Sequence, residues 1–173
     1  LPAEAMDESL SRAAAAAARH VAHSSTDDAV LSGNSLKVPW IMGGAVSLYF
    51  RDAFMVLWKK GMGADFKDLT AMYPEYDVWV TGHSLGAALA TLAASYVVAA
   101  CHVPSSKVFV ITFGQPRVGD YRFARAYEEK MGYSFRVTHW RDWVPHVLPE
   151  KFFNYYHHSP EARLSFSGNT CHR

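Results

Sequence analysis

An α/β fold with a mostly parallel sheet is the class that this sequence predicts, because strand-like and helix-like segments alternate along it. Runs rich in β-branched and aromatic residues occur at 76–81, 107–113 and 133–138, and each has the length of a strand. Helix-like runs separate them at 85–100 and 119–131. This spacing is typical of parallel strands joined by crossover helices. The expected order ends with an irregular tail after the third strand.

Two more helices are predicted before the first strand. Apolar residues recur with a helical spacing from position 46 to position 58, which gives this helix one apolar face. Gly61 and Gly63 interrupt the pattern. A second helical piece covers 64–72 and ends before Pro74, since the residue before a proline disfavours helical geometry. These helices precede the strand at the centre of the predicted sheet.

The N-terminal part of the chain follows a different pattern. Residues 9–23 contain an alanine run and predict a helix, because alanine has the highest helix propensity. Residues 24–45 are rich in serine, glycine and aspartate, with only short apolar islands. We therefore expect one domain over residues 1–173, with an atypical N-terminal segment at 1–42 and a sheet that is incomplete at both ends.

The composition excludes several classes of function. The 173 residues are 50% apolar and 19% charged, as in ordinary globular domains. The net charge of +1 and the lack of a basic cluster argue against nucleic acid as a partner. No apolar run approaches the roughly 18 residues of a membrane span, so no transmembrane segment is expected. The histidines lack metal-ligand spacing, so neither a metal nor a cofactor is expected.

The cysteines and the N-terminus leave questions open. Cys101 and Cys171 are compatible with one disulfide bond or with two thiols. The chain begins at Leu1, and no basic region precedes an apolar signal core, so either a signal was removed or the chain is a fragment. The sequence alone leaves the localisation unknown.

The segment Gly82-His83-Ser84-Leu85-Gly86 fits the G-x-S-x-G pattern of a nucleophile elbow. It follows a predicted strand and opens a predicted helix of small residues, which is the context that this motif requires. The glycines on either side of Ser84 allow a sharp turn without Cβ clashes. Ser84 is therefore the candidate nucleophile. The backbone N–H of Leu85 is the candidate oxyanion donor, because it lies at the helix N-terminus.

Asp142 is the candidate acid that would orient a catalytic histidine. In this fold the acid lies on a loop after a strand that follows the serine in sequence, and Asp142 comes shortly after the predicted strand at 133–138. Asp120 is the rival, since it also follows a strand. It stands directly before a helical run, however, where an N-cap is the expected role.

Three motifs, in this order along the chain, resemble the central motifs of class 3 (fungal-type) lipases. Their amino-acid sequences are most similar to those of nematode members. They are TGHSLGAALA at 81–90, TFGQPRVGD at 112–120 and RVTHWRDWVPHVLP at 136–149. The resemblance covers roughly residues 43–161. It implies an α/β-hydrolase fold in which helices flank the sheet, and ester hydrolysis of acylglycerols. It also implies Ser84 as nucleophile and Asp142 as acid.

The resemblance carries further expectations about the environment of the protein. The substrate would be an acylglycerol or another ester, reached through transient contact with a lipid interface. Secretion is favoured. A second reading stays open, in which the chain is a catalytically impaired hydrolase-like protein that binds lipid or a partner. It arises because two parts of the family site are not identifiable in this sequence.

The first of these parts is the second oxyanion donor. From the resemblance we expect an arginine–glycine–serine or arginine–glycine–threonine segment after an early strand, where it would supply the second donor. No such segment precedes the helix at 46–58. Ser32-Gly33 and Gly43-Gly44 occupy that region, and neither is favoured. Loss of one such donor typically lowers the rate by about 10²–10³.

The second part is the catalytic histidine. His146, His157, His158 and His172 follow Asp142 in the sequence. The pair His157-His158 follows a strand-like run at 152–156 and is attractive as a base. The segment YYHHSPE, however, resembles a family segment that lies upstream of the catalytic histidine. We therefore expect the base outside this chain, with His157, His158 and His172 as the alternatives.

Overall fold

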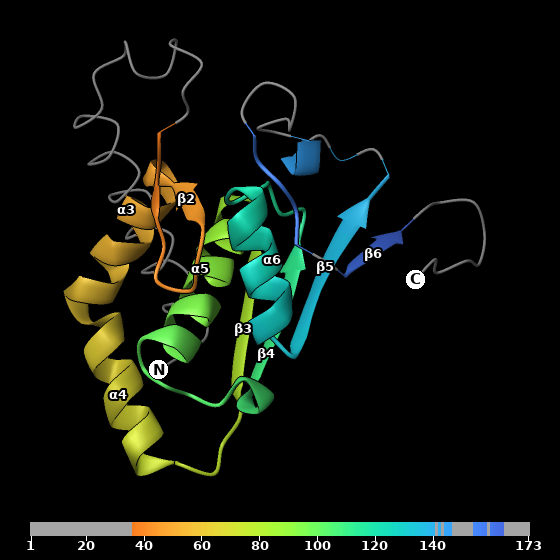
Figure 1. The fold of residues 1–173 in the computed structure, drawn as a ribbon. Coiled ribbons are helices and arrows are strands. Elements are labelled where there is room, and N and C mark those ends of the chain that lie inside the picture. Colours follow the sequence, from red (N-terminus) through yellow and green to blue (C-terminus); the bar gives the residue numbers. More distant parts are fainter. Residues whose placement is uncertain (1–35, 141, 143, 147–153, 159, 165–173) are drawn as a thin grey trace.

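At the centre of the computed structural model lies a parallel sheet whose strand order follows the chain (Figure 1). The structure describes residues 36–140, 142, 144–146, 154–158 and 160–164. Each strand pairs in parallel with the next. The four strands are β3 (Val78–His83), β4 (Val108–Phe113), β5 (Tyr133–His139) and β6 (Glu161–Leu164). The predicted α/β class with a parallel sheet is confirmed.

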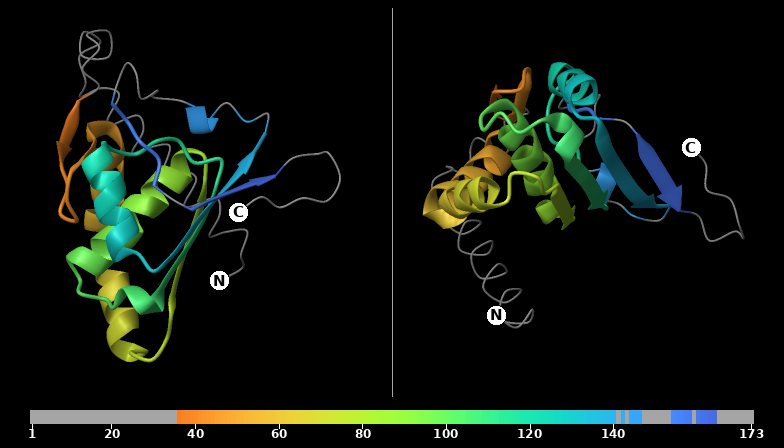
Figure 2. Two further views of the ribbon diagram at one scale, coloured as in Figure 1. Left: turned by 45° about the vertical axis from the view of Figure 1, so that its right-hand side comes forward. Right: turned by 90° about the horizontal axis from the view of Figure 1, so that it is seen from below.

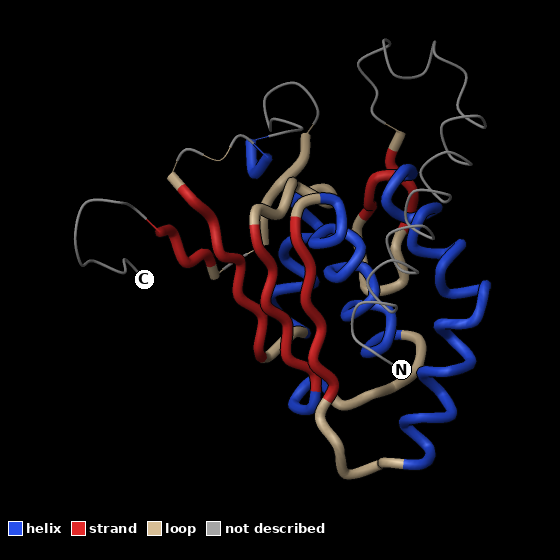
Figure 3. Tube along the Cα trace, turned by 180° about the vertical axis from the view of Figure 1, so that it is seen from behind, coloured by secondary structure: helices blue, strands red, loops and turns tan. Residues whose placement is uncertain are grey.

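The helices lie on one face of this sheet. Helix α5 (Leu85–Ala99) connects β3 to β4, and helix α6 (Tyr121–Lys130) connects β4 to β5. Seen from behind, the strands lie in front of the helices (Figure 3), and the view from below shows the helices to one side of the sheet (Figure 2). On the other face, within the described residues, Trp79, Tyr133 and Phe135 are exposed. The described helices therefore flank the sheet on one side only.

Small side chains let α5 lie close against the sheet. Its residues Ala87, Ala88, Leu92 and Ala94 are completely buried, and the helix packs against β3 and β4. The indole of Trp40 donates a hydrogen bond of 2.8 Å from Nε1 to Ser95 Oγ, deep in the core. The predicted helix over 85–100 is thus confirmed, and its burial follows from its lack of charged residues.

The segment before α3 differs from the prediction. A hairpin of β1 (Lys37–Pro39) and β2 (Ala45–Ser47) comes first, and helix α3 begins only at Leu48 and ends at Leu57. The backbone of β2 is held extended because the N–H of Ser47 donates to Val118 O and Ala45 O accepts from the N–H of Asp120. The helix predicted from position 46 was therefore wrong in its first two residues.

The predicted interruption near Gly61 is confirmed. Gly61 has φ 136° inside a π-helical turn, Trp58–Met62, which joins α3 to α4 (Gly63–Met72). Only glycine adopts such a φ readily. Gly63 lies inside α4, and a Cβ on it would come within 2.7 Å of the Trp58 indole. The two glycines thus have different roles. Gly61 interrupts the helix, and Gly63 leaves space for the Trp58 indole.

The tail after β5 was predicted to be irregular, and this prediction was wrong. Strand β6 pairs in parallel with β5, with Arg136 opposite Glu161. The buried guanidinium of Arg136 donates from Nη2 to Glu161 Oε2 over 3.1 Å, and Thr138 donates to Glu161 Oε1 over 2.7 Å. Burial raises the pKa of Glu161, but the hydrogen bond from Thr138 and the charge of Arg136 outweigh it and leave the pKa lowered.

Some predictions fall outside the described residues. These are the helix at 9–23, Ser32-Gly33 and the residues His172 and Cys171. Cys101 is a free thiol that is partly buried. Within the described ranges, no helix is both long and apolar enough to cross a membrane. The single domain over 1–173 and the atypical segment at 1–42 stay predictions.

Candidate active site

Ser84 joins β3 to α5 in a backbone conformation that L-residues rarely adopt. Its φ is 54° and its ψ is −123°. Such a conformation costs roughly 1–3 kcal/mol and persists only where the surroundings impose it. The Ser84 N–H donates to Phe113 O over 3.0 Å, and its carbonyl accepts from the N–H of Ala87 over 3.0 Å. These bonds, one to β4 and one within the helix start, hold Ser84 at the strand–helix junction.

The two glycines of the motif are not equivalent. A Cβ on Gly82 would lie 2.3 Å from Gly86 O and 2.8 Å from Ala87 N, so the start of α5 leaves no room for a side chain there. A Cβ on Gly86 would meet no described atom within 4 Å. The crowding that the sequence predicts on both sides of Ser84 is therefore found at Gly82 and not at Gly86, among the residues described.

Leu85 is the first residue of α5. Its N–H is among the N-terminal groups of a helix that have no acceptor inside the helix, and the helix dipole makes such groups favourable for a negative charge. The position directly after Ser84 is where an oxyanion donor would be needed. The fold thus leaves Leu85 suited to the predicted role.

Asp142 lies just beyond the end of β5, on the segment that we call the acid loop (the described residues Asp142 and Val144–His146). Its N–H donates to His139 O over 2.9 Å, and its Oδ1 accepts from the N–H of Val144 over 3.0 Å. Oδ2 lies against Gly114, since a Cβ there would come within 2.6 Å of it. Gly114 also has φ +55°. Its missing side chain and its backbone both favour glycine.

The end of β4 connects the candidate nucleophile to the candidate acid. Phe113 O accepts the hydrogen bond from the Ser84 N–H, and the next residue, Gly114, lies against the Asp142 carboxylate. Because β3, β4 and β5 are parallel, their carboxyl ends meet at one edge of the sheet, where ligands bind in open α/β folds. Both predicted residues therefore lie at the edge where the fold places active sites.

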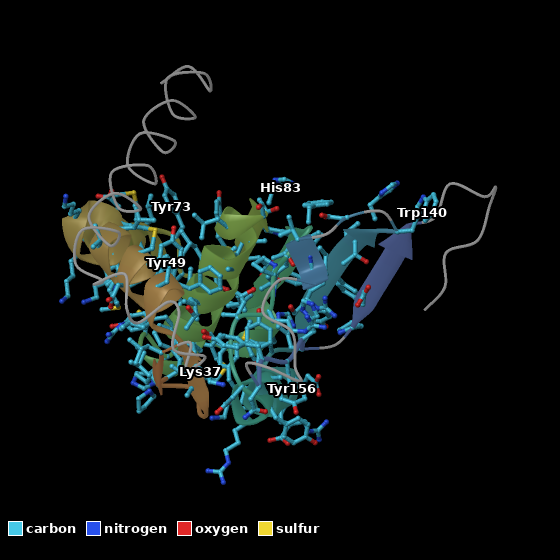
Figure 4. The ribbon with its side chains drawn as sticks, turned by 90° about the horizontal axis from the view of Figure 1, so that it is seen from above. Lys37, Tyr49, Tyr73, His83, Trp140 and Tyr156 are labelled. Atoms are coloured by element: carbon cyan, nitrogen blue, oxygen red, sulfur yellow. The ribbon has the colours of Figure 1, made fainter. Side chains whose placement is uncertain are left out.

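His83 lies beside this edge, on the face of the sheet away from the helices. Its Nε2 would be 3.6 Å from a Cβ on Gly114. Figure 4 shows His83 and Trp140 projecting from the side of the molecule opposite to Lys37 and Tyr156. The His83 side chain is exposed rather than packed.

Asp120, the rival acid, caps helix α6. Its Oδ1 accepts from the Phe123 N–H over 2.8 Å and from the Ala45 N–H over 3.1 Å. The expected N-cap role is thus confirmed, and the second bond also ties β2 to the helix. Both hydrogen bonds hold the Asp120 carboxylate at the start of α6 and at β2, and not at the end of β3.

Gly43-Gly44 forms the turn of the β1–β2 hairpin. The Gly43 N–H donates to Trp40 O, and Gly44 O accepts from the Trp40 N–H. Both hydrogen bonds are 3.0 Å long. A Cβ on Gly44 would lie 2.1 Å from Phe123 N, so the turn packs on the start of α6. This packing gives Gly43-Gly44 a structural role and does not favour it as the second oxyanion donor.

His157 lies below the acid loop with its Nε2 2.7 Å from Pro145 O. A carbonyl oxygen only accepts, so Nε2 carries the proton and donates. Burial, with the nearby charge of Arg136, lowers the pKa of His157 to about 4. A general base works best with a pKa near the working pH. Neither its pKa nor its hydrogen bond favours His157 as the base.

His158 is a core residue. It is 2% exposed, its ring packs against Tyr127 in a tilted arrangement with 4.2 Å between centroids, and its Nε2 is 3.0 Å from Gln115 Nε2. Since the Gln115 amide nitrogen can only donate, His158 Nε2 is the acceptor. A ring enclosed between α6 and the end of β4 is poorly suited to exchange protons with a substrate.

Gln115 is the centre of a buried polar network that the sequence did not predict. Its Oε1 accepts from Thr91 Oγ1 over 3.0 Å and from Thr112 Oγ1 over 2.6 Å, and its Nε2 donates to His158. The network links α5, which begins at the candidate nucleophile, to β4 and to the segment 154–158. The only signal in the sequence was the motif TFGQPR, which leaves its partners unspecified.

Among the described residues, no three histidine, cysteine, aspartate or glutamate side chains lie close enough together to hold a metal ion. The candidate site consists of Ser84, in a strained conformation at a strand–helix turn, and the Asp142 carboxylate just after a nearby strand end. This arrangement is the one expected of the serine-nucleophile core of an α/β hydrolase.

The comparison with protein families names the family. The family described as lipase (class 3) matches residues 13–152. The chain belongs to the class 3 lipase family.

Individual relatives agree. A lipase of Caenorhabditis elegans is 46% identical over 104 residues, which are 60% of this chain and 29% of that protein. This match confirms the predicted similarity to nematode members. A secreted mono- and diacylglycerol lipase A of Penicillium cyclopium is 40% identical over 105 residues, which are 61% of this chain and 33% of that protein.

Solved structures share the fold. A Rhizomucor miehei lipase–propeptide complex aligns with a TM-score of 0.68 and 33% identity, over 82% of this chain and 46% of that one. A triacylglycerol lipase whose structure is described as having a serine protease triad at its catalytic centre aligns with a TM-score of 0.69 and 32% identity, over 79% of this chain and 52% of that one. The chain thus spans about half the length of the solved structures and about a third of the curated relatives.

Proposed function

We propose that the protein is a serine ester hydrolase of the triacylglycerol lipase type, which acts on acylglycerols through an acyl-enzyme at Ser84. The observation that carries the proposal is the positive φ of Ser84, 54°, at the junction of β3 and α5. A non-glycine residue adopts this conformation at a strand–helix turn only under constraint, and a nucleophile elbow supplies a reason for it. Family membership and the names of its lipase relatives support the substrate class.

The proposed reaction begins with attack of Ser84 Oγ on the ester carbonyl carbon. A histidine accepts the hydroxyl proton, and the carbonyl oxygen becomes an oxyanion that the Leu85 N–H stabilises. The C–O bond to the glycerol moiety then breaks, and the histidine returns the proton to the departing alcohol. Water attacks the acyl-enzyme in a second round of the same steps and releases the fatty acid and free Ser84.

Asp142 would hold the histidine ring in the productive orientation. We place the histidine outside the described residues, because His157 donates to Pro145 O and His158 is enclosed in the core. His172 and a residue of a longer protein are the remaining sources. Contact with a lipid interface belongs to the same proposal.

The test uses a fluorophosphonate probe, which forms an adduct only with an activated serine. The chain is first shown to melt cooperatively as one unit, then treated with the probe and digested for mass spectrometry. If His172 is the base, we expect the adduct on Ser84, its loss in Ser84→Ala, and slower labelling in Asp142→Asn. If the base belongs to a longer protein, the same results are expected only of that longer protein. An adduct on another serine, or equal hydrolysis of a triacylglycerol emulsion by the wild type and Ser84→Ala, would refute the proposal.

A second candidate function is a catalytically impaired lipid-binding protein. The specific observation in its favour is that neither histidine of the pair 157–158 is arranged as a base. A folded chain that binds a fatty acid saturably but forms no adduct with the probe would support it. Any burst of acyl-enzyme at Ser84 would exclude it.

A further inference from the structure

The acid loop lies past the end of the sheet, and its described residues form hydrogen bonds at both of its ends. Asp142 N–H donates to His139 O, which fixes the point where the loop leaves β5. The Val144 N–H donates to Asp142 Oδ1 over 3.0 Å, so the position of Val144 sets the orientation of the carboxylate. Pro145, the next residue, is buried. The orientation of Asp142 therefore depends on what holds Val144 and Pro145.

The segment 156–158 is anchored to the body of the protein on two sides. The Tyr156 N–H donates to Gly119 O over 2.8 Å, before α6. The carbonyl of His158 accepts from Arg136 Nε over 2.6 Å, in the middle of β5. His157 lies between these two anchors, so its backbone cannot shift without breaking one of them.

From this anchored position, the side chain of His157 reaches the acid loop. Its Nε2–H donates to Pro145 O over 2.7 Å, the distance of a strong hydrogen bond. Arg136 and Arg117 are close enough for their charges to act on the ring, and Glu161 acts in the opposite sense. The imidazole is thus partly buried, oriented and in contact with the loop that carries Asp142.

We propose that His157 is a positioning residue of the site: through its hydrogen bond to Pro145 O it holds the acid loop in the conformation that orients the Asp142 carboxylate. This inference rests on the proposed function for its catalytic consequence, but its structural part stands on the contacts alone. It also assigns a role to a histidine that is adjacent to the site and is unsuited to act as its base. Displacement of a catalytic group by about 1 Å typically lowers a rate by about 10²-fold, so loss of the bond is expected to matter.

Three variants test the proposal in the full chain. His157→Leu removes the donor and keeps an apolar side chain. His157→Gln keeps an amide N–H that is able to reach Pro145 O. Asp120→Ala is the matched control, because it removes hydrogen bonds of Oδ1 at α6 and β2, away from the acid loop, and destabilises the fold by another route.

Two readouts are measured well below the melting temperature. The first is the hydrogen exchange of the Val144 and Asp142 amides. The second is the second-order rate of fluorophosphonate labelling at Ser84. We expect His157→Leu to raise the exchange rate of Val144 at least about tenfold and to slow labelling at least about tenfold, and His157→Gln to restore most of both. Asp120→Ala is expected to leave both close to the wild type.

The outcomes separate this proposal from the proposed function. Unchanged exchange at Val144 in His157→Leu would overturn it, as would equal effects of His157→Leu and Asp120→Ala. If the wild type itself is not labelled at Ser84, this chain lacks the base, and the proposed function fails for the chain by itself. The exchange of Val144 then still decides whether His157 holds the acid loop.

Discussion

Substitution of the two motif glycines by alanine is expected to have opposite effects on stability. In Gly82→Ala the new Cβ would lie 2.3 Å from Gly86 O and 2.5 Å from Gly86 C. Ordinary contacts of a Cβ begin at 3.4 Å, so the start of α5 must move by about 1 Å. The obstructing atoms belong to the backbone and cannot rotate away. Overpacking of this kind costs about 1–3 kcal/mol, and we expect the upper end of this range.

In Gly86→Ala the Cβ meets no described atom within 4 Å. Gly86 lies in the first turn of α5. Alanine has a higher helix propensity than glycine by about 1 kcal/mol, so stability should rise by up to that amount. For a chain of this size, about 1 kcal/mol corresponds to roughly 2–4 °C in melting temperature.

The assay is thermal and urea denaturation of the two variants beside the wild type, followed by circular dichroism. Gly82→Ala is expected to melt about 6–12 °C lower and Gly86→Ala up to about 4 °C higher. Equal shifts for the two variants, or a lower melting temperature for Gly86→Ala than for Gly82→Ala, would refute the reasoning from Cβ crowding. The comparison is clean because both changes add one methyl group to the same motif.

Three further predictions concern residues around the site. Asp120→Ala should lower the unfolding free energy by about 1–2 kcal/mol, because the cap of helix α6 is lost. Asp120→Asn should recover most of this loss, since asparagine also caps helices. Equal losses for the two variants in urea titrations would contradict the capping role. The pKa of His157 is about 4 when folded and about 6.5 when unfolded, so between these pH values only the unfolded chain takes up the proton. Stability should therefore fall by up to about 3 kcal/mol as the pH drops from 6.5 to 4, and a plot of urea midpoint against pH should lose this slope in His157→Leu. Gln115→Leu should cost about 1–3 kcal/mol, because the buried Thr112 hydroxyl loses its acceptor and His158 Nε2 loses the Gln115 donor, whereas Thr91 keeps Ala87 O as an acceptor. A urea midpoint within error of the wild type would exclude this.

The central part of the fold was predictable because its signals are local. Each buried strand carries β-branched and aromatic residues, and α5 consists mostly of apolar residues, many of them alanine, with Gly86 in its first turn. The pattern at 82–86 specifies a turn whose geometry depends on the residues of the turn itself. Ser84 at φ 54° agrees with that expectation. Asp120 as a cap was likewise predictable, because its role depends on a residue three positions away.

The parts that were missed depend on distant partners. Val46 fits the apolar spacing of α3, but backbone bonds from Ser47 to Val118 and from Asp120 to Ala45 keep this segment extended. Strand β6 has alternating charged and apolar residues and lacks a β-branched run. It forms because Arg136, buried in the neighbouring strand, needs an acceptor that Glu161 supplies. Neither interaction leaves a periodic signal in the sequence.

The candidate site shows the same division. Local motifs in the sequence identify Ser84 and Asp142 as candidates. The position of one relative to the other depends on the end of β4. There Phe113 O accepts from the Ser84 N–H, and Gly114 leaves the space that the Asp142 carboxylate occupies. A side chain at Gly114 would displace Oδ2, which lies 2.6 Å from the Cβ position.

Strand β4, between the candidate nucleophile and the candidate acid, thus helps to set their relative position without contributing a reactive group. This explains why the middle motif at 112–120 accompanies the other two: Gly114 clears room for the acid, Gln115 joins α5 to β4, and Asp120 caps α6. Each of these residues contacts a different element around the candidate site: the acid loop, α5 or α6.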